Sequence, residues 1–353
     1  MCGARGYCRI VSGEAGAWAG PVRGLLRAAE SVYSAAIRLR NACYDRSGAS
    51  YAAEVPVISV GNITVGGTGK TPFVIELATR LDRLGCSPAV VARGYGGASG
   101  EPNDEELLIR RNCPGAAYIA DADRCRAAEW AASRMGADVI VLDDGFQHRR
   151  LARDLDIVLI DATCPFGFEH VLPRGLLREP LGGLRRAGLL IVTRCDQASV
   201  GELSRIGSRL GEIAPDTPVL RCRHCVTAVE RLDGTTIEGP IAGKRAVIFA
   251  AIGRPQAFAT TVESLGVDVV AKRWWPDHHR YRPQDIKAIF DERSFPPHDI
   301  LLTTEKDAVK LVGLSGIDRD SLGVVRVGID FLDGGDTILQ QLLECTLRRE
   351  RTS

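Results

Sequence analysis

The sequence predicts an α/β protein with a doubly wound, mostly parallel sheet, a second, smaller α/β domain and an amphipathic N-terminal helix. Three observations support this fold class. Short apolar runs of strand length alternate with helical stretches across 55–193, as expected for βαβ units. The pattern changes to short β-like pieces across 220–243, which predict a connecting β-ribbon, and then returns to strand and helix alternation. An amphipathic stretch, 20–43, precedes the first strand.

Length and composition are those of a globular protein. The 353 residues are enough for two domains, and 45% are hydrophobic and 25% charged. The formal net charge of +1 provides no general attraction to polyanions, so no nucleic-acid partner is expected. Eleven cysteines without framework spacing indicate free thiols in a reducing compartment. Cys222 and Cys225 form a close pair that lacks a second ligand pair, and we assign them no role.

The N-terminal helix has one apolar face. At about 100° per residue, this face contains Leu25, Leu26, Ala29, Tyr33, Ala36 and Ile37. Arg23, Arg27 and Arg38 fall on the opposite side. The pattern fits a basic helix on an anionic membrane surface and equally a helix packed on its own protein. No uninterrupted apolar segment is long enough to predict a membrane span.

The first predicted strand leads into a glycine-rich turn. The run from Val55 to Val60 is β-branched, and the turn after it ends in Gly69-Lys70-Thr71. Glycines let backbone N–H groups approach an anion, Lys70 can reach the β- and γ-phosphates, and the Thr71 hydroxyl can bind Mg²⁺. Thr64 stands where the usual pattern has a glycine. The turn predicts a nucleotide site in a P-loop NTPase-like sheet, formed by Thr64, Val65, Gly66, Gly67, Thr68, Gly69, Lys70 and Thr71.

The remaining elements of this domain follow from periodicity and from glycine and proline positions. We expect a helix over 72–84, a strand over 88–92, a helix starting near 102–110, a helix over 122–135 and strands over 138–142, 156–160 and 188–193. A long loop is expected over 162–183.

Polar residues follow several of these strands, where open α/β sheets bind ligands. Asp143 and Asp144 end a strand, at the position where a carboxylate holds Mg²⁺ in nucleotide-binding proteins. Arg93 and Tyr95 follow another strand and are candidates for contacting substrate, although a structural loop is the alternative. Arg124 and Arg178 are candidates for neutralising phosphate charge.

The second domain is expected to contain two further polar clusters. Residues 274–281 combine aromatic groups with Asp277, His278 and His279, a composition suited to acid–base chemistry. Residues 303–307 follow a strand and fit either a second catalytic segment or a capped helix start. The expected elements are strands over 246–250, 267–270, 299–303 and 323–328 and helices over 255–265, 283–292 and 336–349.

These patterns divide the chain into four expected parts. They are an amphipathic helical segment over 1–50, a P-loop domain over 51–222, a ribbon over 223–243 and the smaller domain over 244–353. The final helix belongs to the smaller domain or packs back on the first one.

Seven motifs in order resemble the tetraacyldisaccharide 4′-kinase family of lipid A biosynthesis. They are VGNITVGGTGKTP, ARGYGG, DDGFQHRRLARDLDIVLID, LPRGLLREP, AAIGRP, PDHHRY and TTEKDAVK. The resemblance covers nearly the whole chain and explains Thr64, since the family carries Ser or Thr there. It implies ATP-dependent, Mg²⁺-requiring phosphorylation of the 4′-hydroxyl of a tetraacylated glucosamine disaccharide 1-phosphate. It also implies a peripheral or monotopic protein on the anionic cytoplasmic face of the inner membrane.

The resemblance further implies roles for individual residues. Asp104 and His278 correspond to the pair that takes the proton of the acceptor hydroxyl. Lys70 and Arg178 match phosphate-binding positions, and Arg124 lies at another polar family position. Thr71, Asp143, Asp144 and Glu179 match the metal site.

The segment around Asp104 departs from the family, because the glycine and proline that flank its acidic pair are missing. Glu105 or Glu106 could therefore replace Asp104, and His279 could replace His278.

One further segment fits a different class of function. Thr193-Arg194-Cys195-Asp196 faintly resembles a guanine-reading motif, which would suit a nucleotide switch or a metal-delivery GTPase. That reading leaves DDGFQH and the amphipathic helix unexplained.

Overall fold

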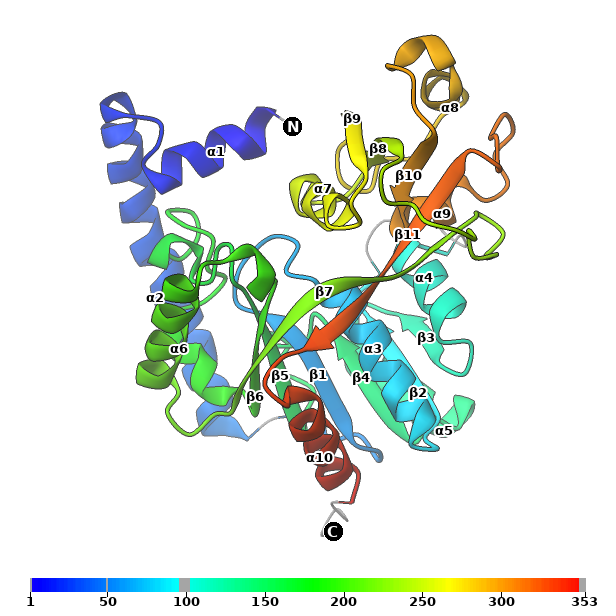
Figure 1. Cartoon of the computed structure of the whole chain (residues 1–353). Helices are drawn as coiled ribbons and strands as arrows, with labels where there is room; N and C mark the ends of the chain where they lie inside the picture. The colour runs from blue at the N-terminus through cyan, green and yellow to red at the C-terminus, as the bar shows by residue number, and fades with distance from the viewer. Residues whose placement is uncertain (1, 49, 95–101, 349–353) are drawn as a thin grey trace. The chain divides into compact units, whose positions relative to one another are not determined.

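The computed structural model describes all residues except 1, 49, 95–101 and 349–353 (Figure 1). The described chain divides into two compact units. The first contains Met1–Gly96, Asn112–Arg223 and Asp330–Ser353, and the second contains Gly97–Arg111 and His224–Ile329. Two hydrogen-bonded neighbouring strands, β7 and β11, each run from one unit into the other, as a ribbon connection requires.

The first unit is built on a parallel sheet in the strand order β3-β2-β4-β1-β5-β6-β7. The order reverses direction around β1, which is the doubly wound pattern that sequence predicted. Strands β1, β2, β4, β5 and β6 are buried along their whole length, as expected for strands covered on both faces. The strands are β1 Val57–Asn62, β2 Pro88–Ala92, β3 Ala117–Ala120, β4 Val139–Asp143, β5 Leu155–Asp161, β6 Leu189–Thr193 and β7 Val219–Glu230.

Two helices of the first unit begin at side-chain caps. Asp123 accepts hydrogen bonds from the first turn of α5, and Ser199 forms a capping box with Glu202 at the start of α6. The helices are α1 Cys2–Ser12, α2 Gly20–Ser47, α3 Lys70–Arg83, α5 Arg124–Met135, α6 Val200–Ile213 and α10 Gly335–Arg348 (Figure 1).

The second unit has its own parallel sheet, in the order β11-β10-β8-β9. Its core includes Phe249, Trp275 and Tyr281, whose rings meet edge to face. The strands are β8 Arg245–Ala250, β9 Asp268–Trp274, β10 Ile300–Thr304 and β11 Leu322–Phe331, and the helices are α7 Pro255–Glu263, α8 Pro283–Phe290 and α9 Glu305–Leu311. Helix α4, Asp104–Asn112, begins in this unit.

Some expected elements differ from the structure. The stretch after residue 218 is one twelve-residue strand, β7, rather than several short pieces. Its partners β6 and β11 are distant in sequence, so local pattern did not reveal them. Helices α1 and α6 and strand β3 were not expected. The segment 303–307 is a capped helix start, because Thr304 accepts a hydrogen bond from the N–H of Asp307. The expected domain bounds stay a prediction. In the structure, the second compact unit combines 97–111 with 224–329.

Helix α2 both packs on the first unit and exposes an apolar stripe. Tyr33 donates to the carbonyl of Arg178 (3.1 Å), and the Glu30 carboxylate accepts from the N–H of Val171 (2.8 Å). On another side, Leu25 is 75% exposed and Val32 73%. The predicted apolar face is therefore divided between the body and solvent. None of the helices in the described part of the chain combines the length and apolar character needed to cross a bilayer.

Candidate active site

The glycine-rich turn connects β1 to α3 and is anchored from outside. Gly66 (φ 121°) and Gly69 (φ 86°) occupy the left-handed region, which side chains disfavour. The N–H of Val65 donates to the carbonyl of Leu176 (2.8 Å), and the Thr193 hydroxyl donates to the carbonyl of Thr68 (3.2 Å). These bonds give the turn a defined path to the start of α3 at Lys70.

Lys70 lies between the turn and the end of β4. Its Nζ is 3.3 Å from Oδ1 of Asp144 and donates to Oδ1 of Asn62 at 3.2 Å. Asn62 in turn donates to the carbonyl of Thr64 (2.7 Å). The ammonium group is thus oriented by residues on both sides of the turn.

Asp144 is contacted by three of the residues predicted for the site, namely Lys70, Arg178 and Arg124. Arg178 Nη1 contacts both its carboxylate oxygens, at 2.8 and 2.9 Å, and Arg124 donates to its backbone carbonyl at 3.0 Å. Burial by itself would raise the pKa of Asp144, but the charges of Lys70 and Arg178 outweigh it, and the pKa lies below its ordinary value. Its φ of 51° is unusual for a residue with a side chain and is common at functional sites.

Glu179 is fully buried and surrounded by N–H donors. Arg186 Nη2 donates to both carboxylate oxygens (3.0 and 2.8 Å), and Gln147 (3.0 Å) and Asn41 (3.2 Å) donate as well. Gln147 also donates to the backbone carbonyl of Asn62 at 3.0 Å. The cluster therefore connects helix α2 to the start of the glycine-rich turn.

A buried ion pair supports the other side of the turn. Arg194 contacts the Asp161 carboxylate and donates to the carbonyl of Gly67 at 3.1 Å. Asp161 and Arg194 come from the carboxyl ends of neighbouring strands β5 and β6. Arg194 belongs to the segment that resembled a guanine reader, yet it is buried against the turn.

The remaining predicted residues of the first unit differ in their surroundings. Asp143 ends β4 and is buried, and Thr71 lies in the first turn of α3. Arg124 is buried at the start of α5, whereas Arg93 is exposed after β2. Tyr95 lies outside the described residues.

Asp104 and His278 meet within the second unit. His278 Nδ1 is 3.4 Å from Oδ2 of Asp104, although the two residues come from α4 and from the loop after β9. Asn103 caps α4 through the N–H of Glu106 (2.8 Å), which places Asp104 in the first helical turn. Burial would raise the pKa of Asp104, but contacts with His278 and Lys310 outweigh it and lower the pKa. The carboxylate is therefore ionised at neutral pH.

The neighbouring candidates are engaged elsewhere. His279 Nε2 lies 2.9 Å from Oδ2 of Asp285, and its ring stacks on Trp275. Glu106 forms an ion pair with Arg110 at 2.6 Å. His278, with a side chain 60% exposed, is the histidine that contacts Asp104.

Sequence reasoning did not identify Asn62, Arg186 or Lys310. Asn62 ends the strand before the turn, and Arg186 follows Glu179 in the same loop region, so position alone gave weak signals. Lys310 lies four residues after Lys306 in TTEKDAVK, a spacing that places both on one face of a helix.

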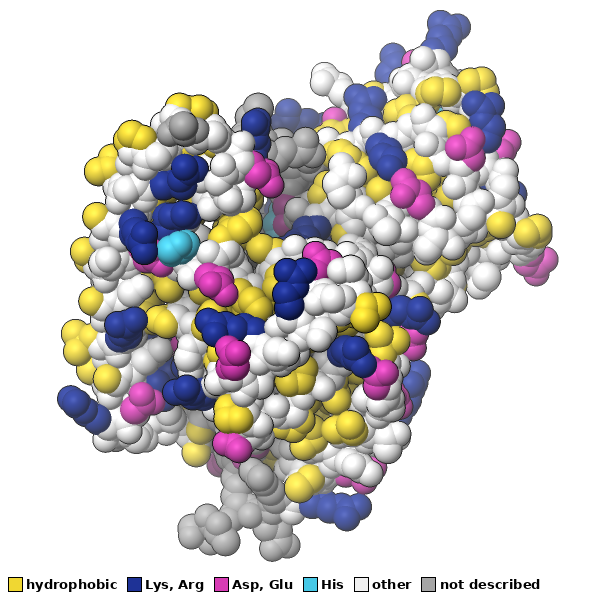
Figure 2. Space-filling model, turned by 60° about the vertical axis from the view of Figure 1, so that its left-hand side comes forward, with side chains coloured by type: hydrophobic (Ala, Val, Ile, Leu, Met, Phe, Trp, Pro, Cys, Tyr) yellow, Lys and Arg dark blue, Asp and Glu magenta, His cyan; other side chains and the backbone are white. Residues whose placement is uncertain are grey.

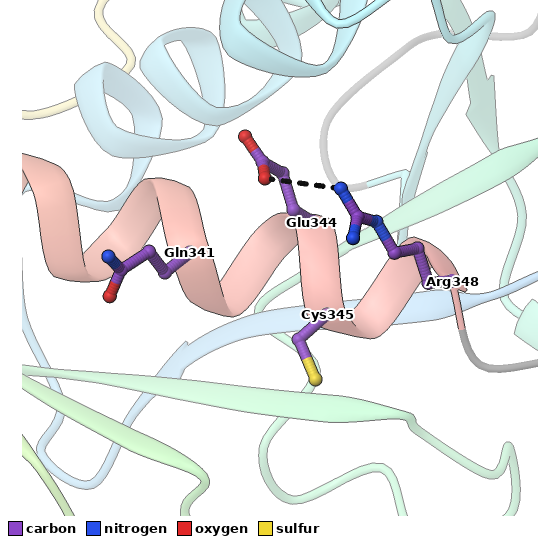
Figure 3. A pocket seen from close by; sticks show the side chains of 4 residues that line it. All are labelled: Gln341, Glu344, Cys345 and Arg348. Atoms are coloured by element: carbon purple, nitrogen blue, oxygen red, sulfur yellow. Dashed lines mark ion pairs between the residues drawn. The ribbon is translucent and has the colours of Figure 1, made fainter.

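A surface hollow in the first unit is formed by Gln341, Glu344, Cys345 and Arg348, all from α10 (Figure 3). Glu344 and Arg348 form an ion pair across one helical turn at 3.7 Å. None of the predicted site residues lines this hollow, and we attach no function to it.

Comparison with known proteins identifies the family. The family model for tetraacyldisaccharide-1-P 4′-kinase matches residues 22–346. This chain belongs to the tetraacyldisaccharide 4′-kinase family. It is 39% identical over 341 residues to a tetraacyldisaccharide 4′-kinase of Anaeromyxobacter sp. (strain K), covering 90% of this chain and 89% of that protein.

Two further comparisons agree with that assignment. A tetraacyldisaccharide 4′-kinase of Syntrophus aciditrophicus (strain SB) is 41% identical over 313 residues, covering 81% of this chain and 84% of that protein. The crystal structure of LpxK from Aquifex aeolicus in complex with ATP has a TM-score of 0.70 and 28% sequence identity, covering 92% of this chain and 99% of that one. The predicted activity, an ATP-dependent lipid A 4′-kinase with an alcohol group as acceptor, is confirmed at family level.

Proposed function

We propose that this member of the 4′-kinase family transfers the γ-phosphoryl group of ATP to the 4′-hydroxyl of a tetraacylated disaccharide 1-phosphate, with Mg²⁺. The observation that carries the proposal is the convergence of Lys70, Arg178 and Arg124 on Asp144 beside the glycine-rich turn. Phosphoryl transfer depends mainly on positioning and on neutralising negative charge, which these cations supply.

The donor set near the turn fits Mg²⁺. The Thr71 hydroxyl and the carboxylates of Asp143 and Asp144 provide hard oxygen ligands, which this ion prefers. When bound, Mg²⁺ neutralises phosphate charge. The Asp144 carboxylate is already paired with Lys70 and Arg178. It can bind the ion only when these two side chains turn away from it towards phosphate oxygens.

Glu179 is the fourth predicted ligand. Arg186, Gln147 and Asn41 already donate to its oxygens, so these contacts favour a positioning role. Metal binding by Glu179 stays a prediction.

Asp104 and His278 are proposed to activate the acceptor hydroxyl. An ionised carboxylate can accept the hydrogen bond of the hydroxyl and take its proton as the phosphoryl group is transferred. Because the pKa of Asp104 is lowered, its carboxylate is ionised across the neutral pH range and can accept the proton. His278, whose side chain is 60% exposed, lies beside this carboxylate and is proposed to hold it in position.

The exposed stripe of α2 is proposed to lie on an anionic membrane surface. Leu25, Val32 and Leu39 of α2 are spaced by seven residues and are each at least 68% exposed, as is Trp18 in the short 3-10 turn Ala17–Ala19 that precedes the helix. That spacing keeps them on one side of a helix. Figure 2 shows hydrophobic and basic side chains together on the side of the first unit where α2 lies. Exposed arginines on the same helix, Arg27, Arg38, Arg40 and Arg46, supply attraction to anionic lipid.

The direct test is transfer of labelled phosphate from [γ-³²P]ATP to the purified disaccharide lipid in detergent. We expect a labelled lipid product that requires Mg²⁺, and much less product when GTP replaces ATP. Nucleotide hydrolysis without any labelled lipid, or an equal rate with GTP, would overturn the proposal.

A further inference from the structure

Helix α9 places two lysines on one face, and both contact the Asp104–His278 pair. Lys310 Nζ lies 3.3 Å from Oδ2 of Asp104. Lys306 Nζ lies 3.1 Å from Oδ1 of Asp277 and 3.5 Å from Nε2 of His278. Positions four residues apart share a helix face, so a single helix serves both members of the pair.

Lys310 is a buried cation with a fixed position. Its side chain is 7% exposed, and Nζ is also 3.3 Å from Oδ1 of Asp307. The other oxygen of Asp307 accepts from the N–H of Ala251 (3.0 Å) and from the Thr304 hydroxyl (2.8 Å). Strands β8 and β10 thus set the place of Lys310 through Asp307. Burying an ammonium group costs free energy unless its charge is paired, and Asp307 and Asp104 are the two carboxylates that contact it.

Lys306 determines which ring nitrogen of His278 carries the proton. An ammonium group donates and cannot accept, so its contact with Nε2 at 3.5 Å favours that nitrogen as the acceptor, and Lys306 also pairs with the Asp277 carboxylate that lies 3.9 Å from the same nitrogen. In neutral imidazole the proton is then on Nδ1, the atom 3.4 Å from Oδ2 of Asp104. His278 therefore presents an N–H to the Asp104 carboxylate.

We propose that Lys306 and Lys310 are positioning residues for acceptor activation: Lys310 holds the Asp104 carboxylate in place, and Lys306 selects the His278 tautomer that donates to it. This inference rests on the proposed function of Asp104 and His278. It adds two residues that touch neither the nucleotide turn nor the carboxylates of β4 in the described contacts.

The charge balance at Asp104 makes the inference measurable. Burial by itself would raise the pKa of this carboxyl, and contacts with His278, Lys310 and Lys306 lower it. The titratable groups around it are Glu105 and Glu106 on α4, Asp277 and His278 in the loop after β9, and Lys306, Asp307 and Lys310 on α9. If the charge of Lys310 is removed, fewer contacts offset the effect of burial on this carboxyl. The pKa of Asp104 should therefore rise.

The first experiment compares the pH dependence of kcat/KM for wild type, Lys310→Met, Lys310→Gln and Lys310→Arg. A cation within ~4–6 Å lowers a carboxyl pKa by about 1–3 units, so both neutral variants should lose activity at a pH at least about one unit higher on the acid side. Lys310→Arg should retain the wild-type profile. Lys272→Met is the matched control, because Lys272 forms an exposed ion pair with Glu263 (2.6 Å) on the same unit.

The second experiment records the histidine side-chain nitrogen resonances by NMR, with His278→Gln to assign the signal. We expect the wild-type ring to carry its proton on Nδ1 and Lys306→Ala to shift it towards Nε2. Because the spectrum requires no turnover, a loss of activity does not affect the readout.

The outcomes separate this inference from the proposed function. If Asp104→Asn loses turnover while the acid side of the Lys310→Gln profile is unmoved, the role of Lys310 is wrong and that of Asp104 stands. Full turnover by Asp104→Asn would instead refute the role of Asp104. A wild-type His278 protonated on Nε2 would refute the role of Lys306.

Discussion

The Nζ atom of Lys70 lies 3.3 Å from Oδ1 of Asp144, which joins the nucleotide turn to the acidic end of β4. Arg178 contacts the same carboxylate at 2.8 Å. Two cations therefore share one anion within a single unit. Two positive charges therefore lie where the phosphates of a nucleotide are expected. Asp144 pairs with both of them, so neither cation is left unpaired in a partly buried site.

Lys70→Ala should abolish efficient use of ATP. Removing one charge-stabilising donor from a catalytic site typically costs about 10²–10³-fold in kcat. Labelled phosphate transfer at saturating lipid measures the loss. Arg83→Ala, at the exposed end of the same helix α3, is the control and should retain wild-type turnover. A small effect of Lys70→Ala would show that this lysine does not contact the transferred group.

Asp104→Ala should lower turnover while leaving ATP affinity nearly intact. A general base supplies ~10²–10⁴-fold in rate, and this carboxylate lies in a different unit from the glycine-rich turn. Single-turnover rates and equilibrium ATP binding separate the two effects. If ATP binding fails together with turnover, Asp104 acts as a structural or metal-binding residue. Glu106→Gln, which removes only a helix ion pair with Arg110, is the matched variant.

Arg194→Ala should destabilise the first unit. The change leaves the Asp161 carboxylate buried without its main cation and removes the hydrogen bond to Gly67. Breaking a buried pair in this way costs about 3–5 kcal/mol of unfolding free energy. Denaturant titration measures this cost. The exposed pair Arg209–Glu212 provides the control, since Arg209→Ala should cost less than about 1 kcal/mol.

Leu25→Glu and Val32→Glu should weaken binding to anionic vesicles. Each change replaces an apolar side chain on the exposed stripe with a charge that anionic lipid repels, so we expect roughly tenfold weaker binding per substitution. Sedimentation with phosphatidylglycerol vesicles measures it. Val200→Glu alters an equally exposed apolar residue on α6 and should bind as wild type does. Equal binding by all four proteins would mean that α2 does not contact the membrane.

His148 should remain neutral well below the usual histidine range. Burial and the charges of Arg124 and Arg153 lower its pKa to about 4. Unfolded histidine titrates near 6.5, so the unfolded chain takes up this proton first and stability falls as pH decreases from about 6.5 towards 4. NMR titration gives the pKa directly. His148→Gln should reduce the slope of unfolding free energy over that range, whereas an ordinary titration near pH 6.5 would contradict the prediction.

Much of the candidate site in the first unit could be predicted from local sequence. The turn at 64–71 and the carboxylates at the end of β4 are defined by residues that are adjacent in the chain, and parallel strands bring their carboxyl ends to one edge of a sheet. By contrast, local sequence could not predict that His278, rather than His279, contacts Asp104. Both histidines occupy the same loop, and only the packing of His279 on Trp275 and Asp285 distinguishes them.

Helix α2 also combines a feature that local sequence predicted with one that only tertiary packing decided. Its periodicity predicted an amphipathic helix but could not tell a solvent-exposed side from a body-facing side, because both are apolar. Contacts of Glu30 and Tyr33 with the loop near Arg178 decide which side is covered. Similarly, Glu179 was recognised as important by its motif, while the donors around it come from residues 41, 147 and 186.

The amino-acid order alone specified the class of fold, the glycine-rich turn and the family, since these depend on periodicity and on neighbouring residues. Tertiary packing alone decided which charges meet: Lys70 with Asp144, Arg194 with Asp161, and Lys310 with Asp104. Electrostatic interactions depend on distance in space and on burial, and neither quantity is encoded in separation along the chain.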